Sequence, residues 1–296
     1  MIKHFEGQFA GVECVGLSNG VITLHAMKQA GPRIIGLQAG KGTNLMAEVP
    51  LAGESEDEFI PRGGQRLWHG PEDPVRTYQP DNAPVAIELT DSGVILTQET
   101  EKKTGIQKSM RIEMTDGKGE LTVKYGLKNH NMWPVSLTAW PISQMRAGGF
   151  AILPLSIVDT GLLPNRRLVF WPYTDVRLEN IVVLNRYMFV QASYHGTEKA
   201  KVGWLNDRGW IGYYLDRTLL VKRAAYVAGG AYVDLGCSME CYADQRFLEL
   251  ETMSPLTLVQ PGERLVFEEN WFVFSDINLS MQEDSVEEVI KDLNIE

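Results

Sequence analysis

Apolar and polar residues alternate along most of this chain, which is the pattern of strands that bury one face of a sheet. Near the N-terminus, GVITLHAM (residues 20–27) and RIIGL (residues 33–37) follow this pattern and flank a Gly31-Pro32 turn. Residues 44–49 are consistent with a third strand. From residue 83 onward, strand-like segments follow one another with short turns, so the pattern predicts a β-rich protein.

Turn residues and the scarcity of helical periodicity define the predicted architecture. Asp91-Ser92-Gly93 and Asp116-Gly117 mark two hairpins. A 3.6-residue period is clear only near the C-terminus, where Ser285 to Glu288 resembles a capping box that begins a helix. Gly and Pro are spread along the chain, and no linker stands out. We therefore predict an all-β sandwich of two large, mostly antiparallel sheets with a short C-terminal helix, as a single domain over residues 1–296.

One long irregular region interrupts the strands. Residues 50–64 are acidic, contain Pro and Gly, and lack periodicity, and loops of this length are often functional. The stretch GGQRLWHGPEDP follows at residues 63–74 and concentrates Arg66, Trp68, His69 and Glu72 among glycines and prolines. This region is therefore a candidate part of a functional site.

Composition and charge narrow the function classes. The chain has 296 residues, 44% of them hydrophobic, with a net charge of −10 and a pI of about 5.1. This acidity argues against a nucleic-acid partner, because binding phosphates needs a basic surface. Three cysteines are too few and uneven for a disulfide framework. The N-terminus lacks the pattern of a signal peptide and no apolar run is long enough to span a bilayer, so we expect a cytoplasmic protein with no membrane partner.

A pair of glutamates marks the strongest candidate for chemistry. In RFLELETM (residues 246–253), the strand period places Glu249 and Glu251 on one face, roughly 6.5–7 Å apart along the strand. Like charges that close repel, which raises one pKa unless a cation or hydrogen-bond donors intervene. The alternative is that both glutamates are solvent-exposed residues of an edge strand.

Other kinds of site find less support in the sequence. His69, Glu72 and Asp73 are close together, but no second group of ligands completes a metal site. The GxSxG nucleophile elbow and the glycine-rich phosphate loops are absent from the sequence. We therefore expect no metal and no cofactor.

Aromatic residues beside polar residues favour a carbohydrate ligand. Seven tryptophans include Trp68, which lies next to Arg66 and His69, and Trp171, which begins the polar and aromatic stretch WPYTD that contains Tyr173. Sugars present C–H faces to aromatic rings and hydroxyls to planar polar groups. The alternative is that these aromatics fill the core of the sandwich.

Several of these segments, in their order along the chain, resemble the galactose mutarotase-like superfamily, which includes the aldose 1-epimerases. The segments are GGQRLWHGPE with YQPDN, then KNHNMWPVSLTAWPISQMRAGGFAILPL, LPNRRLVFWPYTD, KVGWLNDRGWIGYYL and ELETMSPLTLVQPGERLVFEENW. Together they cover roughly residues 15 to 275, and within the superfamily the chain more closely resembles an uncharacterised bacterial branch. The resemblance implies a β-supersandwich with a sugar-binding concave face.

The resemblance also implies roles for individual residues. In epimerases of this fold, a late-strand glutamate removes the anomeric hydroxyl proton, a histidine protonates the ring oxygen, and the sugar ring opens. Leu250-Glu251-Thr252 matches the context of that glutamate, so Glu251 is the candidate base and Glu249 the close alternative. In SLTAWPISQM, Trp140 takes the place of the histidine, and an indole is no acid near neutral pH. His69 or His130 would have to supply the proton.

The residues and the resemblance are compatible with two functions. The first is an epimerase or another sugar-active enzyme that uses Glu251 as base, with His69 as its acid. The second is a non-catalytic module or sensor that binds a small or oligomeric carbohydrate; a periplasmic polysaccharide-remodelling domain fits less well, because no signal peptide is visible. In either case, the expected substrate-binding residues are Arg66, Trp68, Glu72, Asp81, Trp140, Tyr173 and Glu249.

Overall fold

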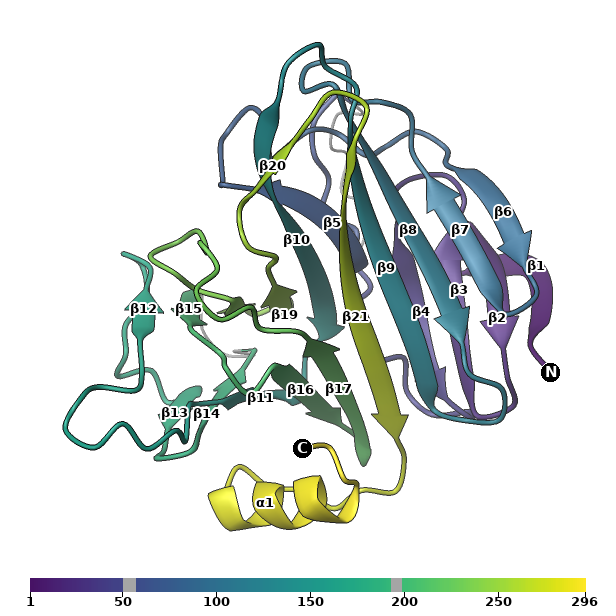
Figure 1. The fold of residues 1–296 in the computed structure, drawn as a ribbon. Coiled ribbons are helices and arrows are strands. Elements are labelled where there is room, and N and C mark those ends of the chain that lie inside the picture. The colour runs from purple at the N-terminus through teal and green to yellow at the C-terminus, as the bar shows by residue number, and fades with distance from the viewer. Residues whose placement is uncertain (50–56, 193–198) are drawn as a thin grey trace.

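The computed structural model describes residues 1–49, 57–192 and 199–296. Part of the long loop predicted to be functional at residues 50–64, namely residues 50–56, lies outside the described residues. Nearly all of the regular structure is β-strand, arranged in two large sheets, with one C-terminal helix among the described residues (Figure 1). The predicted all-β sandwich with a short C-terminal helix is therefore confirmed.

The first sheet contains eleven strands and carries the candidate site. Its strands, in order across the sheet, are β1 (Lys3–Phe9), β2 (Val12–Ser18), β3 (Ile22–Met27), β4 (Ile34–Ala39), β5 (Gly64–Gly70), β10 (Val135–Arg146), β19 (Phe247–Thr252), β18 (Met239–Ala243), β15 (Ala200–Trp204) and β12 (Leu168–Phe170), while β20 (Thr257–Val259) also pairs with β10. Strands distant in sequence meet at its centre, where β10 lies between β5 and β19. All of the pairings among these strands are antiparallel.

The second sheet contains ten strands and packs against the first. In order they are β13 (Ile181–Val183), β14 (Tyr187–Gln191), β11 (Phe150–Pro154), β16 (Trp210–Leu215), β17 (Thr218–Ala224), β21 (Arg264–Phe274), β9 (Glu120–Asn129), β8 (Ile106–Met114), β7 (Gly93–Thr97) and β6 (Ala86–Thr90). Both predicted hairpins are present, as β6–β7 and β8–β9.

Alternating apolar residues from both sheets form the main core. In β9, Leu121, Val123 and Tyr125 point inward, while the residues between them are partly exposed. They share one hydrophobic cluster with Leu248 and Leu250 of β19 in the opposite sheet. Because side chains alternate along a strand, Glu249 and Glu251 must point to the other face of the first sheet, away from this core.

A charged network lies inside this core, between the two sheets. Lys222 of β17 and Glu269 of β21 are both fully buried, with Nζ 3.1 Å from Oε1. Tyr125 and Trp271 donate hydrogen bonds to Glu269 Oε2 at 2.6 and 2.8 Å. From the first sheet, Thr252 donates a hydrogen bond to Glu269 Oε1. The network therefore joins the second sheet to the residue directly after Glu251.

The C-terminal helix α1 (Glu283–Asp292) packs against the outer face of one end of the second sheet, at β14, β11, β16 and β17 (Figure 1). Its buried Val286 and Ile290 pack in a cluster with Phe150, Phe189 and Trp210. The predicted capping box is wrong, because the N-cap is Gln282, three residues before Ser285, and no side chain caps the helix there. No helix in the described ranges has the length and apolarity needed to cross a membrane.

Candidate functional site

Five strands of the first sheet bring a polar and aromatic cluster to the sheet's outer face. The cross-strand pairs are Trp68 with Trp140 and Gln144 with Glu249. On the next strand, Glu240 lies opposite Glu251. We call the side chains that β5, β10, β19, β18 and β15 present on this face the outer-face cluster; they include Arg66, Trp68, Trp140, Gln144, Lys201, Glu240, Tyr242, Glu249 and Glu251.

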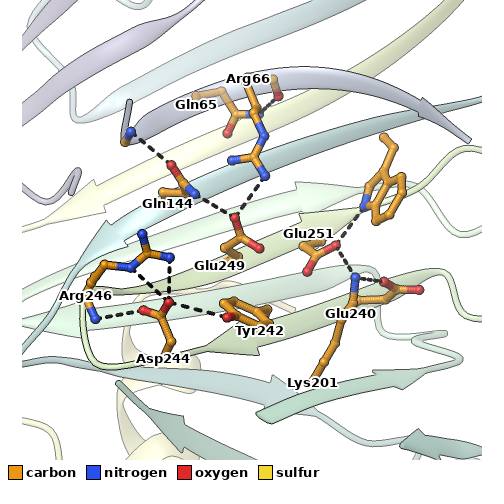
Figure 2. A network of polar contacts seen from close by, with 12 residues as sticks. Gln65, Arg66, Gln144, Lys201, Glu240, Tyr242, Asp244, Arg246, Glu249 and Glu251 are labelled. Carbon is orange, nitrogen blue, oxygen red and sulfur yellow. Dashed lines mark hydrogen bonds and ion pairs between the residues drawn. The ribbon is translucent and has the colours of Figure 1, made fainter. Parts of the chain in front are cut away.

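Glu251 is held at one oxygen and open at the other. Trp140 Nε1 donates a hydrogen bond to Glu251 Oε2 at 2.8 Å, and Lys201 Nζ donates another at 3.0 Å (Figure 2). Glu251 Oε1 is buried and receives no hydrogen bond from any residue in the described ranges. A buried acceptor without a donor is costly, so this oxygen is poised for a hydroxyl or ammonium group of a ligand.

Lys201 bridges two buried carboxyl groups. Its Nζ lies 2.7 Å from Glu240 Oε2 and 3.0 Å from Glu251 Oε2 (Figure 2). The ammonium also stacks between aromatic faces, 4.8 Å from the ring centroid of Trp140 and 4.7 Å from that of Trp171. Lys201 is therefore fixed by charge and by aromatic contact at the centre of the cluster.

The pKa values of Glu251, Glu240 and Lys201 are shifted by burial and by the charges of one another. Burial raises the pKa of Glu251, although Lys201 opposes this, and burial raises the pKa of Glu240 well above its usual range. Burial alone would lower the pKa of Lys201, but Glu251 and Glu240 raise it well above its usual value. Lys201 therefore stays cationic at neutral pH, and Glu240 is the carboxyl that retains a proton most readily.

Glu249 has its own set of donors beside Glu251. Arg66 Nη2 and Gln144 Nε2 each lie 2.9 Å from Glu249 Oε1 (Figure 2). The guanidinium of Arg66 stacks over the Trp68 ring, with its carbon 4.4 Å from the ring centroid. Trp68 in turn meets Trp140 edge-on, at 5.5 Å between centroids. The two glutamates thus have distinct environments, which the even spacing along the strand does not reveal.

The fold is shared with known proteins, although no protein-family model and no curated protein matches the sequence. A TPR-domain containing protein from Parabacteroides distasonis is 15% identical with a TM-score of 0.60, over 91% of this chain and 48% of that one, so this chain spans about half of its length. A galactose mutarotase-like protein from Lactobacillus casei is 11% identical with a TM-score of 0.57, over 88% of this chain and 100% of that one. A galactose mutarotase-like protein from Clostridium acetobutylicum is 10% identical with a TM-score of 0.56, over 93% and 98%.

The chain has the galactose mutarotase-like fold. Five of the residues predicted from sequence share the outer face of this fold: Arg66, Trp68, Trp140, Glu249 and Glu251. Two more lie at its rim. Tyr173 is half exposed, its ring is 6.5 Å from that of Tyr242, and its pKa is raised to about 12 by burial and by neighbours that include Glu251. Glu72 is exposed and accepts a hydrogen bond from Tyr78 at 2.5 Å.

His69 is not part of the outer-face cluster in this mutarotase-like fold. It follows Trp68 in β5 and therefore points to the opposite face, where its Nε2 lies 3.3 Å from Glu101 Oε2. Glu101 is also paired with Lys108 at 2.6 Å, so all three residues form a buried polar network inside the sandwich. The expectation that His69 converges with Trp68 and Glu251 is therefore wrong.

His130 and Asp81 are also placed elsewhere. His130 directly follows β9 of the second sheet, and its Nε2 lies 3.3 Å from Gln107. Asp81 pairs with the fully buried Arg33 at 2.6 Å and lines an open cavity of about 1140 Å³ together with Arg62 and Gln98. This cavity is thus separate from the outer-face cluster, and Asp81 stabilises the chain around Arg33 instead of joining the predicted site.

Lys201 and Glu240 belong to the outer-face cluster but were not predicted from the sequence. Each is a charged residue in the middle of a short apolar strand, AKVGW in β15 and MECYA in β18. A charged residue in such a strand has to be paired or functional, because its burial is otherwise costly. That signal is present in the sequence, whereas the pairing partners depend on the order of strands in the sheet.

The buried network of His69, Glu101 and Lys108 predicts how the stability of the fold changes at acidic pH. Burial lowers the pKa of His69 below 6.5, so the unfolded state binds a proton more readily. Stability should therefore fall as the pH drops below about 6.5. It should fall again between pH 4.5 and 2, because Lys108 and His69 overcome the effect of burial and hold the pKa of Glu101 at about 2.

Urea unfolding across this pH range tests the prediction. His69→Asn should flatten the first decline, since its side chain does not titrate, while Glu99→Gln nearby should leave that decline unchanged. An unaltered pH dependence in His69→Asn would show that His69 does not control acid stability.

Proposed function

We propose that this protein binds a carbohydrate at the outer-face cluster and that Glu251 acts as a general base on it, in the manner of an aldose 1-epimerase. The observation that carries this proposal is the oriented carboxylate of Glu251. One oxygen is fixed by Trp140 and Lys201, and the other is buried without a donor from the described chain. The fold that it shares with galactose mutarotase-like proteins supports the same conclusion.

The environment of Glu251 suits proton abstraction from a sugar hydroxyl. A general base works best when its pKa lies near the working pH, and burial raises the pKa of Glu251 in that direction. In the reaction that we propose, Glu251 Oε1 takes the proton of the anomeric hydroxyl, whose oxygen forms a carbonyl with the anomeric carbon. The bond from the anomeric carbon to the ring oxygen breaks at the same time, and its electron pair passes to the ring oxygen. The ring oxygen must then gain a proton, and we assign this role to the Lys201–Glu240 pair, whose ammonium lies 3.0 Å from Glu251 Oε2.

Access to Glu251 requires a local rearrangement. Glu251 has no exposed surface, and Trp171 stacks over the neighbouring Lys201. Thr174 secures the same segment, because its Oγ1 donates to Lys201 O and accepts from Lys201 N, both at 2.9 Å. We therefore propose that sugar binding displaces the aromatic segment 171–174, so that Tyr173 and Trp171 become walls of the bound state.

Non-catalytic sugar binding is the second candidate. It is favoured by Trp140, which stands where the resemblance places the acid histidine and uses its indole N–H to hold Glu251. It is also favoured by the position of His69 on the opposite face of β5. Two carboxylates raise the pKa of Lys201, which makes its ammonium a weak acid and a poor proton donor to the ring oxygen. The same residues would then bind a sugar without turnover.

Equilibrium binding of a sugar panel tests the shared part of both candidates. We expect titration calorimetry with neutral aldoses and short oligosaccharides to show a specific complex. Trp140→Phe should weaken it by about tenfold, because the variant keeps a ring but leaves Glu251 without its indole donor. Trp133→Phe, which alters an exposed tryptophan outside the cluster, is the matched control and should bind like the parent. Equal effects of the two variants, or no binding of any sugar, would contradict the proposal.

A further inference from the structure

The outer-face cluster carries more negative than positive charge. Five carboxyl groups lie in it or at its rim, and two cations accompany them; the carboxyl groups are Glu72, Asp234, Glu240, Glu249 and Glu251, and the cations are Arg66 and Lys201. Arg66 is already paired with Glu249, and Lys201 is shared by Glu240 and Glu251. Asp234 and Glu72 therefore have no cationic partner of their own among these groups.

Three carboxylate oxygens in this region are buried without a donor. They are Asp234 Oδ2, Glu240 Oε1 and Glu251 Oε1, and none receives a hydrogen bond from the part of the chain that the structure describes. Glu240 and Glu251 are fully buried, so water does not solvate these oxygens freely. Such atoms need a donor from outside the chain, or a proton that one carboxyl group holds for its neighbour.

Asp234 is brought to Glu240 by an unusual loop. Asp234, Leu235 and Gly236 all have positive φ, at 49°, 61° and 90°. The loop is closed by hydrogen bonds from the N–H groups of Gly236 and Cys237 to Val233 O. Arg167 Nη1 also donates to Leu235 O at 2.8 Å. Residues other than glycine adopt positive φ at a cost, so the surrounding contacts hold this conformation against its strain.

Asp234 adds a further carboxyl group beside Glu240 in this region. Glu240 lies within hydrogen-bonding reach of Asp234, and Glu72 and Lys201 are close enough to shift its pKa. Two acceptor carboxylates that face each other repel unless a proton or a cationic donor lies between them. The described residues include no set of three or more His, Cys, Asp or Glu side chains arranged to hold a metal ion. An ammonium group fits better, since it offers three donors and one positive charge.

We propose that the carbohydrate bound at the outer-face cluster is an amino sugar, whose ammonium group binds Asp234 and Glu240 in place of the proton that these two carboxyl groups share. This inference rests on the proposed carbohydrate binding and names the class of sugar. Glu251 then binds a hydroxyl of the same ring. An anionic sugar is disfavoured, because the excess of carboxylates repels a uronate or a phosphate.

Matched pairs of sugars test this inference. Titration calorimetry compares glucosamine with glucose, galactosamine with galactose, and mannosamine with mannose, with glucuronate as the anionic member. We expect at least one amino sugar to bind about tenfold more tightly than its hydroxyl counterpart, because hydrogen bonds to charged groups are stronger than neutral ones. Glucuronate should bind more weakly than glucose.

Asp234→Asn separates the ammonium contact from the rest of the site. The amide keeps the shape of the side chain and removes its charge, so the preference for the amino sugar should fall to about threefold or less, with binding of the neutral sugar retained. Glu72→Gln, at an exposed position, should reduce the preference by a smaller factor. Asp284→Asn, on the exposed surface of α1, is the control with the same change of charge and should keep the preference. Thermal melting of each variant shows whether it is folded.

The outcomes distinguish this inference from the proposed function. Neutral sugars that bind as tightly as their amino counterparts, a preference that survives in Asp234→Asn, or tighter binding of glucuronate would each overturn the amino-sugar inference and leave carbohydrate binding intact. An absence of binding by every sugar would overturn both.

Discussion

Lys222→Met is expected to lower the free energy of unfolding by about 3–5 kcal/mol, because it leaves the charge of Glu269 buried between the two sheets without its cation. Both side chains are fully buried, with Nζ 3.1 Å from Oε1. Tyr125, Trp271 and Thr252 would still donate hydrogen bonds to Glu269, but they do not neutralise its charge. Urea unfolding of the parent and the variant measures the difference.

The exposed pair of Lys124 and Glu268 provides the matched control for this experiment. Its atoms are 3.2 Å apart and its side chains are 43% and 45% exposed, on the same two strands, β9 and β21, that carry Tyr125 and Glu269. Lys124→Met should cost less than about 1 kcal/mol, since exposed ion pairs contribute little. The double variant Lys222→Met with Glu269→Gln should recover part of the loss. A cost for Lys222→Met as small as that of the control would contradict the assignment.

Glu251→Gln is expected to reduce the exchange of sugar anomers by about 10²–10⁴-fold, because the amide keeps the shape of the side chain and does not accept the proton. Sugar binding should persist, since Trp140 and the rest of the outer-face cluster are unchanged. Exchange spectroscopy by NMR measures interconversion of the two anomers directly, at equilibrium and without a coupled assay. Binding by the same sugar is measured in parallel.

Glu249→Gln is the informative comparison for this experiment. Glu249 is held by Arg66 and Gln144 at one oxygen, and it lies on the same face and the same strand as Glu251. We expect this variant to weaken binding more than turnover, because Glu249 is one of the residues expected to bind the substrate and is not the proposed base. If Glu249→Gln abolished exchange and Glu251→Gln did not, the roles of the two glutamates would be reversed. Exchange that neither variant slows would remove both from the chemistry.

The fold was predictable because its signals are local. Turn residues and alternating side chains mark hairpins such as β6–β7 and β8–β9 without knowledge of the rest of the chain. The helix start was less predictable. Ser285 lies inside α1, and its Oγ accepts a hydrogen bond from Ser280 N instead of capping the helix. Packing of Val286 and Ile290 on the second sheet fixes the helix, so a capping pattern alone gave the wrong first residue.

The site was predictable only where one strand or one short motif contains its residues. Glu249 and Glu251 share a strand face by simple alternation, and the same rule separates His69 from Trp68, although both belong to one conspicuous motif. Lys201 and Glu240 meet Glu251 because β15 and β18 follow β19 in the sheet, an order that sequence spacing does not contain. Long-range strand order therefore set the limit of the prediction.

A crystal structure of the protein with its tightest-binding sugar tests the central proposal most directly. We predict that the sugar occupies the outer face of the first sheet, with a hydroxyl within hydrogen-bonding distance of Glu251 Oε1 and with Trp171 and Tyr173 moved to its sides. A sugar bound in the separate cavity lined by Arg62, Asp81 and Gln98, with Glu251 still covered, would contradict the account.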